Sequence, residues 1–175
     1  DKTIRKIRQY VLSFEVMPSM RMLWAAGPAA KKDNTTIYNC SFANIDCIEA
    51  FAECLHILMC GTGFGFSVSK ENVDKLPEVK PLTTDRLPDY IVGDSKEGWA
   101  DSVKFLMETL YDGKHVHFDY SQLRPEGARL HTMGGRSSGP APLIRLHQVM
   151  REVFSKAQGR QLRPIECHDI CDQIA

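Results

Sequence analysis

The sequence lacks the features of membrane-spanning, secreted and polyanion-binding proteins. Its longest apolar stretches, such as residues 55–60, are far too short to cross a bilayer, and no signal peptide is visible. Basic and acidic residues balance at 22 each, so no excess of positive charge indicates a nucleic-acid-binding surface. We therefore expect a cytoplasmic protein with no membrane partner and no direct nucleic-acid partner.

The composition is otherwise that of an ordinary globular protein. The 175 residues suffice for one domain with a core, and 43% of them are hydrophobic. Six cysteines without a leader sequence argue against a disulfide framework, so we expect core residues, metal ligands or redox catalysts. The sequence opens and closes inside apparent helices, over residues 3–16 and 165–174, and we therefore expect a piece of a longer protein.

Helical and strand-like patterns alternate along the chain, which predicts an α/β architecture. We expect helices over residues 3–16, after the N-caps Asp46 and Asp94, and from Pro142 to about residue 157. We expect strands over residues 35–42, 61–68 and 115–120, and loops over residues 69–93 and 124–140.

Two pairs of cysteines have helical spacing. Cys47 and Cys54 lie one heptad apart, and we expect both in the core. Cys167 and Cys171 share a helix face and could hold half a metal site. Because no second ligand pair has suitable spacing, we expect them to be packing residues and predict no metal site.

Three further segments could carry chemistry. Cys40 lies in an expected strand, where a cysteine is either a buried small hydrophobe or, if accessible, a reactive thiol. The alternate glycines of residues 61–65 would let a ligand approach the backbone and its N–H groups, although tight packing explains them equally well. Arginines among the glycines and serines of residues 124–140, just before a helix, suit phosphate binding or a solvated hairpin.

Four segments occur in the order and spacing of one family. They are Met17-Pro18-Ser19-Met20-Arg21-Met22-Leu23-Trp24, Tyr38-Asn39-Cys40, Cys60-Gly61-Thr62-Gly63-Phe64-Gly65-Phe66-Ser67 and residues 124–143. With these segments the chain resembles the monomeric adenosylcobalamin-dependent (class II) ribonucleoside-triphosphate reductases. The resemblance implies the opening part of the ten-stranded α/β barrel of ribonucleotide reductases, with a helical insertion.

The resemblance also implies roles for individual residues. Cys40 matches one of two thiols that reduce the ribose 2′ position and end as a disulfide, the second thiol lying further along the protein. The implied substrate-binding residues are Ser19, Asn39, Gly61 and Thr62. The implied effector-binding residues are Asp94, Ser95, Trp99, Arg124, Arg136 and Ser137.

The same resemblance divides the chain into three parts without a complete domain boundary. Residues 1–68 correspond to the first barrel strands and helices, 69–116 to an insertion that builds an effector-site element, and 117–175 to a continuation of the barrel with the effector and specificity loop. The insertion indicates the monomeric subclass, because in dimeric reductases the glycine strand runs almost directly into the arginine-rich segment. A surface helical hairpin without ligand contacts is the alternative for the insertion.

The implied cofactor is adenosylcobalamin, with most contacts outside this chain, and the implied effector is a deoxynucleoside triphosphate. The implied partners are a ribonucleoside triphosphate, the remainder of the reductase chain and a thioredoxin-like reductant. The alternatives are a fragment of a dimeric class II or class I ribonucleoside-diphosphate reductase, a nucleotide-binding module in which Cys40 is only a core residue, and a thiol hydrolase, which no cysteine–histidine signature supports.

We expect the 175-residue chain alone not to reduce nucleotides, because the family's radical cysteine, catalytic acid and second reducing thiol do not occur in it. We also expect weak solubility or association of the isolated chain, because an incomplete barrel leaves strand edges and apolar helix faces exposed. An assay of the purified chain with adenosylcobalamin and a dithiol tests the first expectation, which detectable turnover contradicts.

Overall fold

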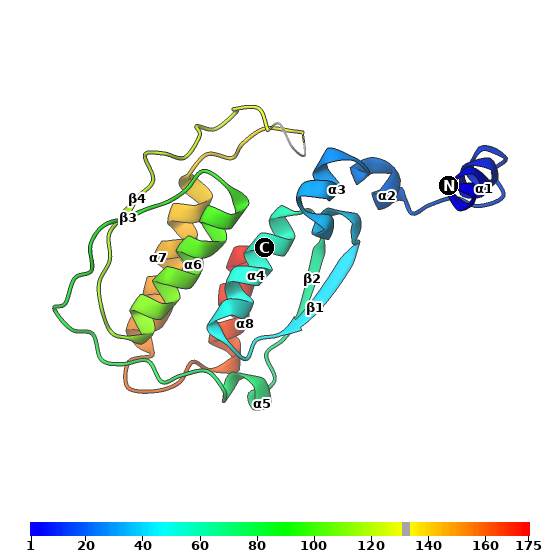
Figure 1. The fold of residues 1–175 in the computed structure, drawn as a ribbon. Helices are drawn as coiled ribbons and strands as arrows, with labels where there is room; N and C mark the ends of the chain where they lie inside the picture. The colour runs from blue at the N-terminus through cyan, green and yellow to red at the C-terminus, as the bar shows by residue number, and fades with distance from the viewer. Residues whose placement is uncertain (131–133) are drawn as a thin grey trace.

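The computed structural model describes residues 1–130 and 134–175, which form a body of packed helices with a two-stranded parallel sheet on one side (Figure 1). The helices are α1 (Lys2–Leu12), α2 (Met20–Ala25), α3 (Pro28–Lys32), the 3₁₀ helix η1 (Asn34–Ile37), α4 (Ile48–Met59), α5 (Lys70–Val73), α6 (Lys96–Tyr111), α7 (Ala141–Lys156) and α8 (Pro164–Ile174). The strands are β1 (Cys40–Asn44), β2 (Gly63–Ser67), β3 (Tyr90–Ile91) and β4 (Phe118–Asp119).

The core lies among helices α4, α6, α7 and α8, which pack against one another. Apolar residues recur at helical spacing on the inner face of each helix, as with Phe51, Cys54 and Leu55 on α4 and Val103 and Leu106 on α6. Burial of one such large side chain contributes about 1.5–3 kcal/mol to the free energy of folding. Packing of these faces therefore fixes α4, on which the sheet depends.

Helix α4 is the crossover between β1 and β2, which pair in parallel with Cys40 opposite Gly63 and Asn44 opposite Ser67. Parallel strands need a connection of this length, because a tight hairpin can join only antiparallel strands. A second, shorter parallel pair joins β3 to β4, with Tyr90 opposite Phe118. The mixture of helices and strands confirms the α/β class at this coarse level.

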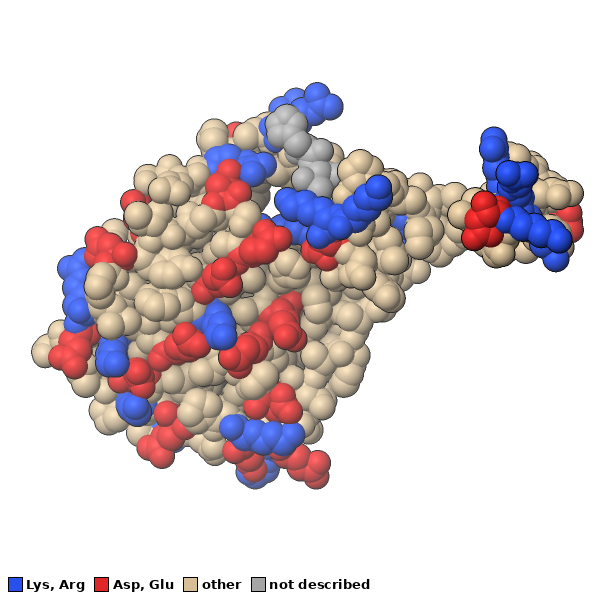
Figure 2. Space-filling model, in the orientation of Figure 1, with Lys and Arg blue, Asp and Glu red and all other residues tan. Residues whose placement is uncertain are grey.

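Helix α1 extends away from the body (Figure 1), and no residue in it is buried. Its apolar side chains Ile4, Ile7 and Leu12 are 65%, 56% and 67% exposed. Figure 2 shows Lys, Arg, Asp and Glu side chains interspersed over the visible face of the helical body. In the part of the chain that the structure describes, no helix is both long and apolar enough to cross a membrane.

Several predicted elements are confirmed in position and type. The glycine-rich strand is β2, and the helix expected from Pro142 is α7. Cys54, Cys167 and Cys171 are buried, as expected of packing residues.

Other predictions are wrong in the type, the first residue or the length of an element. Residues 35–37 lie in η1 rather than in a strand, because the Asp33 side chain accepts the Thr35 N–H and starts a 3₁₀ turn. The N-cap of α4 is Cys47 rather than Asp46, which leaves Cys47 exposed at the start of the helix instead of in the core. Of the strand expected over residues 115–120, β4 keeps two residues.

Buried His147 on α7 makes two hydrogen bonds, one to Ser102 on α6 and one to Tyr120, the residue after β4. Its Nε2 lies 3.2 Å from Ser102 Oγ, and its Nδ1 lies 2.8 Å from the Tyr120 hydroxyl oxygen. Ser102 donates its own hydrogen to the Trp99 carbonyl oxygen, so it accepts from His147 and the imidazole carries its proton on Nε2. Tyr120 then donates to Nδ1. Burial and the nearby Arg151 charge lower the pKa of His147 to about 3.

The free energy of unfolding is expected to fall as the pH drops from about 6.5 to about 3. In this interval the unfolded imidazole binds a proton and the folded one does not, so each step toward acid favours unfolding, by on the order of 4 kcal/mol in total. His147→Gln keeps one donor and one acceptor without titrating, and it should flatten this part of the profile. Urea unfolding across the interval measures the effect, with the exposed-site variant His168→Gln as control. An unchanged profile in His147→Gln would contradict the assignment.

Candidate functional site

Cys40 is the first residue of β1 and is exposed. Exposure alternates along the strand, so Cys40, Phe42 and Asn44 share the open face while Ser41 and Ala43 lie on the half-buried face. The interpretation of Cys40 as a buried core residue is therefore wrong. The strand holds this thiol at a fixed position on an accessible surface.

The strand beside Cys40 presents bare backbone on the same face. Gly63 and Gly65 are the exposed residues at the start and middle of β2, and they lie opposite Cys40 and Phe42. A Cβ atom on Gly63 would lie 3.9 Å from the Cys40 sulfur and 3.4 Å from the Asn39 carbonyl oxygen. The two glycines thus leave room for a ligand to approach the thiol across the sheet.

The backbone N–H groups at the start of this strand are not free to bind an anion, contrary to one interpretation of the glycine pattern. The N–H groups of Gly61, Thr62 and Gly63 donate to the carbonyl oxygens of Leu58, Ile57 and Asn39. The first two bonds end α4, where Gly61 takes a φ of +75°. The segment therefore offers shape and space to a ligand rather than these donors.

Of the other expected substrate residues, Asn39 directly precedes β1 and Thr62 directly precedes β2. The Thr62 side chain is buried, with its hydroxyl 2.8 Å from the Thr35 carbonyl oxygen and 2.9 Å from that of Tyr38, so it ties β2 to η1. Ser19 is exposed and accepts the Met22 N–H as the N-cap of α2. Asn39 is exposed beside Cys40.

Arg21 on α2 lies next to Gly61 and belongs to the motif 17–24, although the sequence analysis assigned it no role. A Cβ on Gly61 would lie 3.2 Å from one nitrogen of its guanidinium, which therefore packs against the glycine backbone. A positive charge here suits a phosphate, for which arginine is well shaped. Its position depends on the fold of α2, which spacing alone did not reveal.

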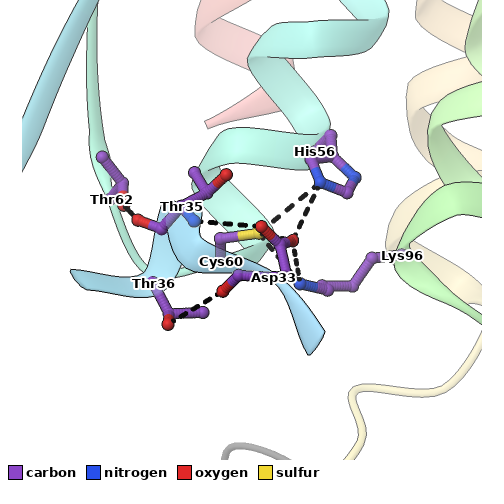
Figure 3. Close-up of polar contacts among 7 residues, drawn as sticks. All are labelled: Asp33, Thr35, Thr36, His56, Cys60, Thr62 and Lys96. Atoms are coloured by element: carbon purple, nitrogen blue, oxygen red, sulfur yellow. Dashed lines mark hydrogen bonds and ion pairs between the residues drawn. The ribbon is translucent and has the colours of Figure 1, made fainter. Parts of the chain in front are cut away.

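A polar cluster of Asp33, His56, Cys60 and Lys96 joins the start of η1, the end of α4 and the first turn of α6 (Figure 3). Asp33 Oδ2 accepts from Lys96 Nζ at 2.9 Å and from the Cys60 thiol at 3.0 Å, and it lies 3.1 Å from His56 Nε2. Lys96 Nζ also lies 2.9 Å from the Cys60 sulfur. The other carboxylate oxygen, Oδ1, accepts the Thr35 N–H at 3.0 Å.

The charges of this cluster follow from its hydrogen bonds. Burial opposes ionisation of Asp33, but hydrogen bonds from Cys60, Lys96 and Thr35 outweigh it and hold the pKa of the carboxyl far below its usual value. Burial also acts against the Lys96 ammonium, whose bonds to Asp33 and Cys60 nevertheless raise its pKa. Burial, followed by donation to Asp33, raises the pKa of the Cys60 thiol. The cluster is therefore a carboxylate–ammonium pair with a neutral thiol.

The expected effector residues form a separate group at the start of α6. Arg124 Nε lies 3.0 and 2.9 Å from the two carboxylate oxygens of Asp94. The N-cap of α6 is Ser95, whose hydroxyl accepts the Gly98 N–H, so the expectation that Asp94 caps this helix is wrong. Trp99 is half-buried and packs against the core.

Arg136 and Ser137 lie on one arm of a hairpin. Ser137 pairs through its backbone with Gly127 and Ala128, and the Arg136 guanidinium donates to the Gly127 carbonyl oxygen at 2.9 Å. Residues 131–133 of the expected effector loop lie outside the described residues. The hairpin agrees with the alternative of a charged hairpin, and an effector role for it stays a prediction.

Lys96 is the link between the two groups of expected site residues. It follows Asp94 and Ser95 in sequence, and its ammonium contacts the side chain of Cys60, the residue before Gly61. Trp99 and Lys96 both belong to the first turns of α6, so this helix contacts both regions. Sequence spacing gave no sign of this connection.

The described residues 1–130 and 134–175 do not by themselves fit a corrin cofactor. An open cavity of about 530 Å³ is lined by residues around β4 and α7 rather than by β1 or β2. This cavity is therefore remote in the fold from the Cys40 thiol, and it does not offer a cobalamin a place beside that sulfur.

Comparison with known proteins gives a consistent result. Residues 65–154 match the family described as B12-dependent ribonucleotide reductase, insertion domain, a segment that includes the expected insertion 69–116. An adenosylcobalamin-dependent ribonucleoside-triphosphate reductase of Euglena gracilis is 31% identical, with 94% of this chain and 24% of that protein aligned. The enzyme of the same name from Lactobacillus gasseri is 25% identical, with 97% of this chain and 31% of that protein aligned.

A solved structure shares the fold. The crystal structure of a B-12 dependent (class II) ribonucleotide reductase superposes with a TM-score of 0.83 at 23% identity, covering 97% of this chain and 31% of that one. The chain thus spans between about a quarter and a third of these proteins.

Gly98→Ala is expected to destabilise the protein by about 1–3 kcal/mol, because a Cβ at this position would overlap the backbone of Gly93. The same change elsewhere in a helix usually stabilises by about 0.5–1 kcal/mol, so the sign of the effect is diagnostic. Chemical unfolding measures it. Gly65→Ala, where a Cβ meets nothing closer than 3.6 Å, is the control. Stabilisation by Gly98→Ala would contradict the close approach.

Proposed function

The chain belongs to the B12-dependent ribonucleotide reductases, and from this premise we propose that it forms part of an enzyme that converts ribonucleoside triphosphates to 2′-deoxyribonucleoside triphosphates. The observation that carries the proposal is Cys40, an exposed thiol on a rigid strand beside the bare backbone of Gly63 and Gly65. A nucleotide-binding module would not need an accessible thiol at this position.

In the proposed reaction Cys40 is one of two reducing thiols. The ribose 2′-hydroxyl leaves as water, and the two electrons for its replacement by hydrogen come from two thiols that become a disulfide. A thioredoxin-like dithiol then exchanges with this disulfide and restores the thiols. Adenosylcobalamin, held mostly by residues outside this chain, would supply the radical chemistry that protein side chains do not provide unaided.

The remaining residues of the site position the nucleotide. We assign substrate contacts to Ser19, Asn39 and Gly61, which are exposed, and a supporting role to Thr62, which is buried. Arg21 contributes positive charge for the phosphates from its place against Gly61. Packing of Thr62 between η1 and β2 keeps this end of the sheet in register.

The insertion 69–116 and the hairpin carry the proposed effector site. Asp94, Ser95 and Trp99 at the start of α6, together with Arg124, Arg136 and Ser137, would bind a deoxynucleoside triphosphate. Arg124 is held by Asp94, so effector phosphates would compete with this carboxylate for the guanidinium. Lys96 gives this region a direct contact with the substrate side of the chain.

In the proposed enzyme, further chain completes the barrel and covers exposed apolar residues of this part. We propose that β1 and β2 are the opening strands of a ten-stranded barrel, with residues 1–68 and 117–175 in the barrel, and that further chain covers exposed apolar residues such as Phe42, which is 68% exposed. We propose that the complete protein is located in the cytoplasm.

Cys40→Ser in the complete protein is expected to abolish formation of deoxynucleotides while leaving binding of the ribonucleotide, because serine keeps the shape of the site and cannot form a disulfide. Product formation with adenosylcobalamin and a dithiol, and equilibrium binding of the triphosphate, are measured side by side. Cys47→Ser replaces the other exposed cysteine and should keep turnover.

Turnover that survives Cys40→Ser would remove the catalytic assignment of Cys40, and triphosphate binding by the parent protein without any turnover would support the nucleotide-binding module. A preference for diphosphate over triphosphate substrates would instead place the protein with the diphosphate reductases.

A further inference from the structure

We propose that Asp33, His56 and Cys60 form a binding site for a divalent transition metal of the zinc class, in which the metal replaces the ammonium of Lys96. The three side chains present one ligand atom each: carboxylate Oδ2, imidazole Nε2 and Sγ (Figure 3). Carboxylate, imidazole and thiolate are the ligand types that Zn²⁺ takes in proteins.

The distances between the ligand atoms lie within about 0.5 Å of those around one tetrahedral ion. They are 3.1 Å from Oδ2 to Nε2, 3.0 Å from Oδ2 to Sγ and 3.7 Å from Nε2 to Sγ. Zinc bonds of about 2.0–2.3 Å at tetrahedral angles separate ligand atoms by about 3.3–3.6 Å. Small rotations of the side chains therefore suffice to bind an ion, and the fourth position is left for water or another ligand.

The site is built on fixed elements. His56 and Cys60 are four residues apart at the end of α4, so the helix presents both ligand atoms on one face. Asp33 is oriented by the Thr35 N–H, which occupies Oδ1 and directs Oδ2 toward the other two ligands. Such a hydrogen bond to a ligating carboxylate is a usual component of metal sites.

Lys96 shows that the cluster already accommodates a cation. Its ammonium donates to the two atoms, Asp33 Oδ2 and Cys60 Sγ, that would bind a metal. A divalent ion would displace this ammonium and the thiol proton, since a coordinating thiol is deprotonated. The Lys96 side chain is 20% exposed and reaches the cluster from the first residue of α6, so it can leave toward solvent.

Displacement of Lys96 gives the site a consequence for the rest of the chain. The metal would hold η1 to the end of α4 and release the first turn of α6 from Asp33. This turn follows Asp94 and Ser95, so metal binding would loosen the contact between the insertion and the segment before Gly61.

The test is a titration of the metal-free protein with Co²⁺ and with Zn²⁺, without nucleotide or cobalamin, so that its result is independent of the proposed reductase activity. We expect one ion per chain, with the absorption of tetrahedral cobalt and a sulfur-to-cobalt charge-transfer band. Cys60→Ser should remove the charge-transfer band, and His56→Gln should weaken Zn²⁺ binding at least tenfold. Lys96→Met should strengthen it at least tenfold by removing the competing ammonium. Cys47→Ser, at an exposed cysteine outside the cluster, should bind like the parent.

Failure of the parent protein to bind one ion per chain would overturn the proposal. So would a cobalt–sulfur band that survives Cys60→Ser, or Zn²⁺ binding that Lys96→Met weakens in a protein whose circular dichroism shows it folded. Because His56 is partly exposed, His56→Gln tests the site even if the Cys60 variant does not fold.

Discussion

Burial of one face of α4 against α6 and α8 is the interaction on which the rest of the structure depends. The helix connects β1 to β2, so its position sets the parallel register that places Cys40 opposite Gly63. Its last turn carries His56, its C-cap is Cys60, and Gly61 follows directly. Apolar packing on the inner side of the helix therefore determines where the polar groups at its end can meet.

Local patterns predicted much of the fold. The glycine-opened segment 61–68 located β2, and a proline followed by apolar residues at helical spacing located α7. The errors at Asp46 and Asp94 share one feature, because each carboxylate pairs with a basic residue distant in sequence, Asp46 with Lys75 and Asp94 with Arg124. At α6 the hydroxyl of Ser95 took the cap because the Asp94 carboxylate binds Arg124, 30 residues further on. A partner so distant in sequence is not visible in a local motif.

The sequence motifs predicted one part of the candidate site and missed another. The motif around Cys40 identified the thiol, but its exposure depends on which face of β1 the helix covers. The polar cluster was missed because Asp33, His56 and Lys96 come from three separate elements. The four-residue spacing of His56 and Cys60 was its sole local signal, and many helices show such a pair without a ligand.

The different exposure of the cysteines allows ligand binding to be followed by chemical labelling. Cys40 and Cys47 are exposed, and the other four cysteines are buried. An alkylating reagent applied to the folded protein should therefore label these two positions, one on the face beside the glycines and one at the start of α4. Labelling of Cys47 serves as an internal standard, and the ratio of the two reports occupancy of the sheet face by any molecule, without an assay for turnover.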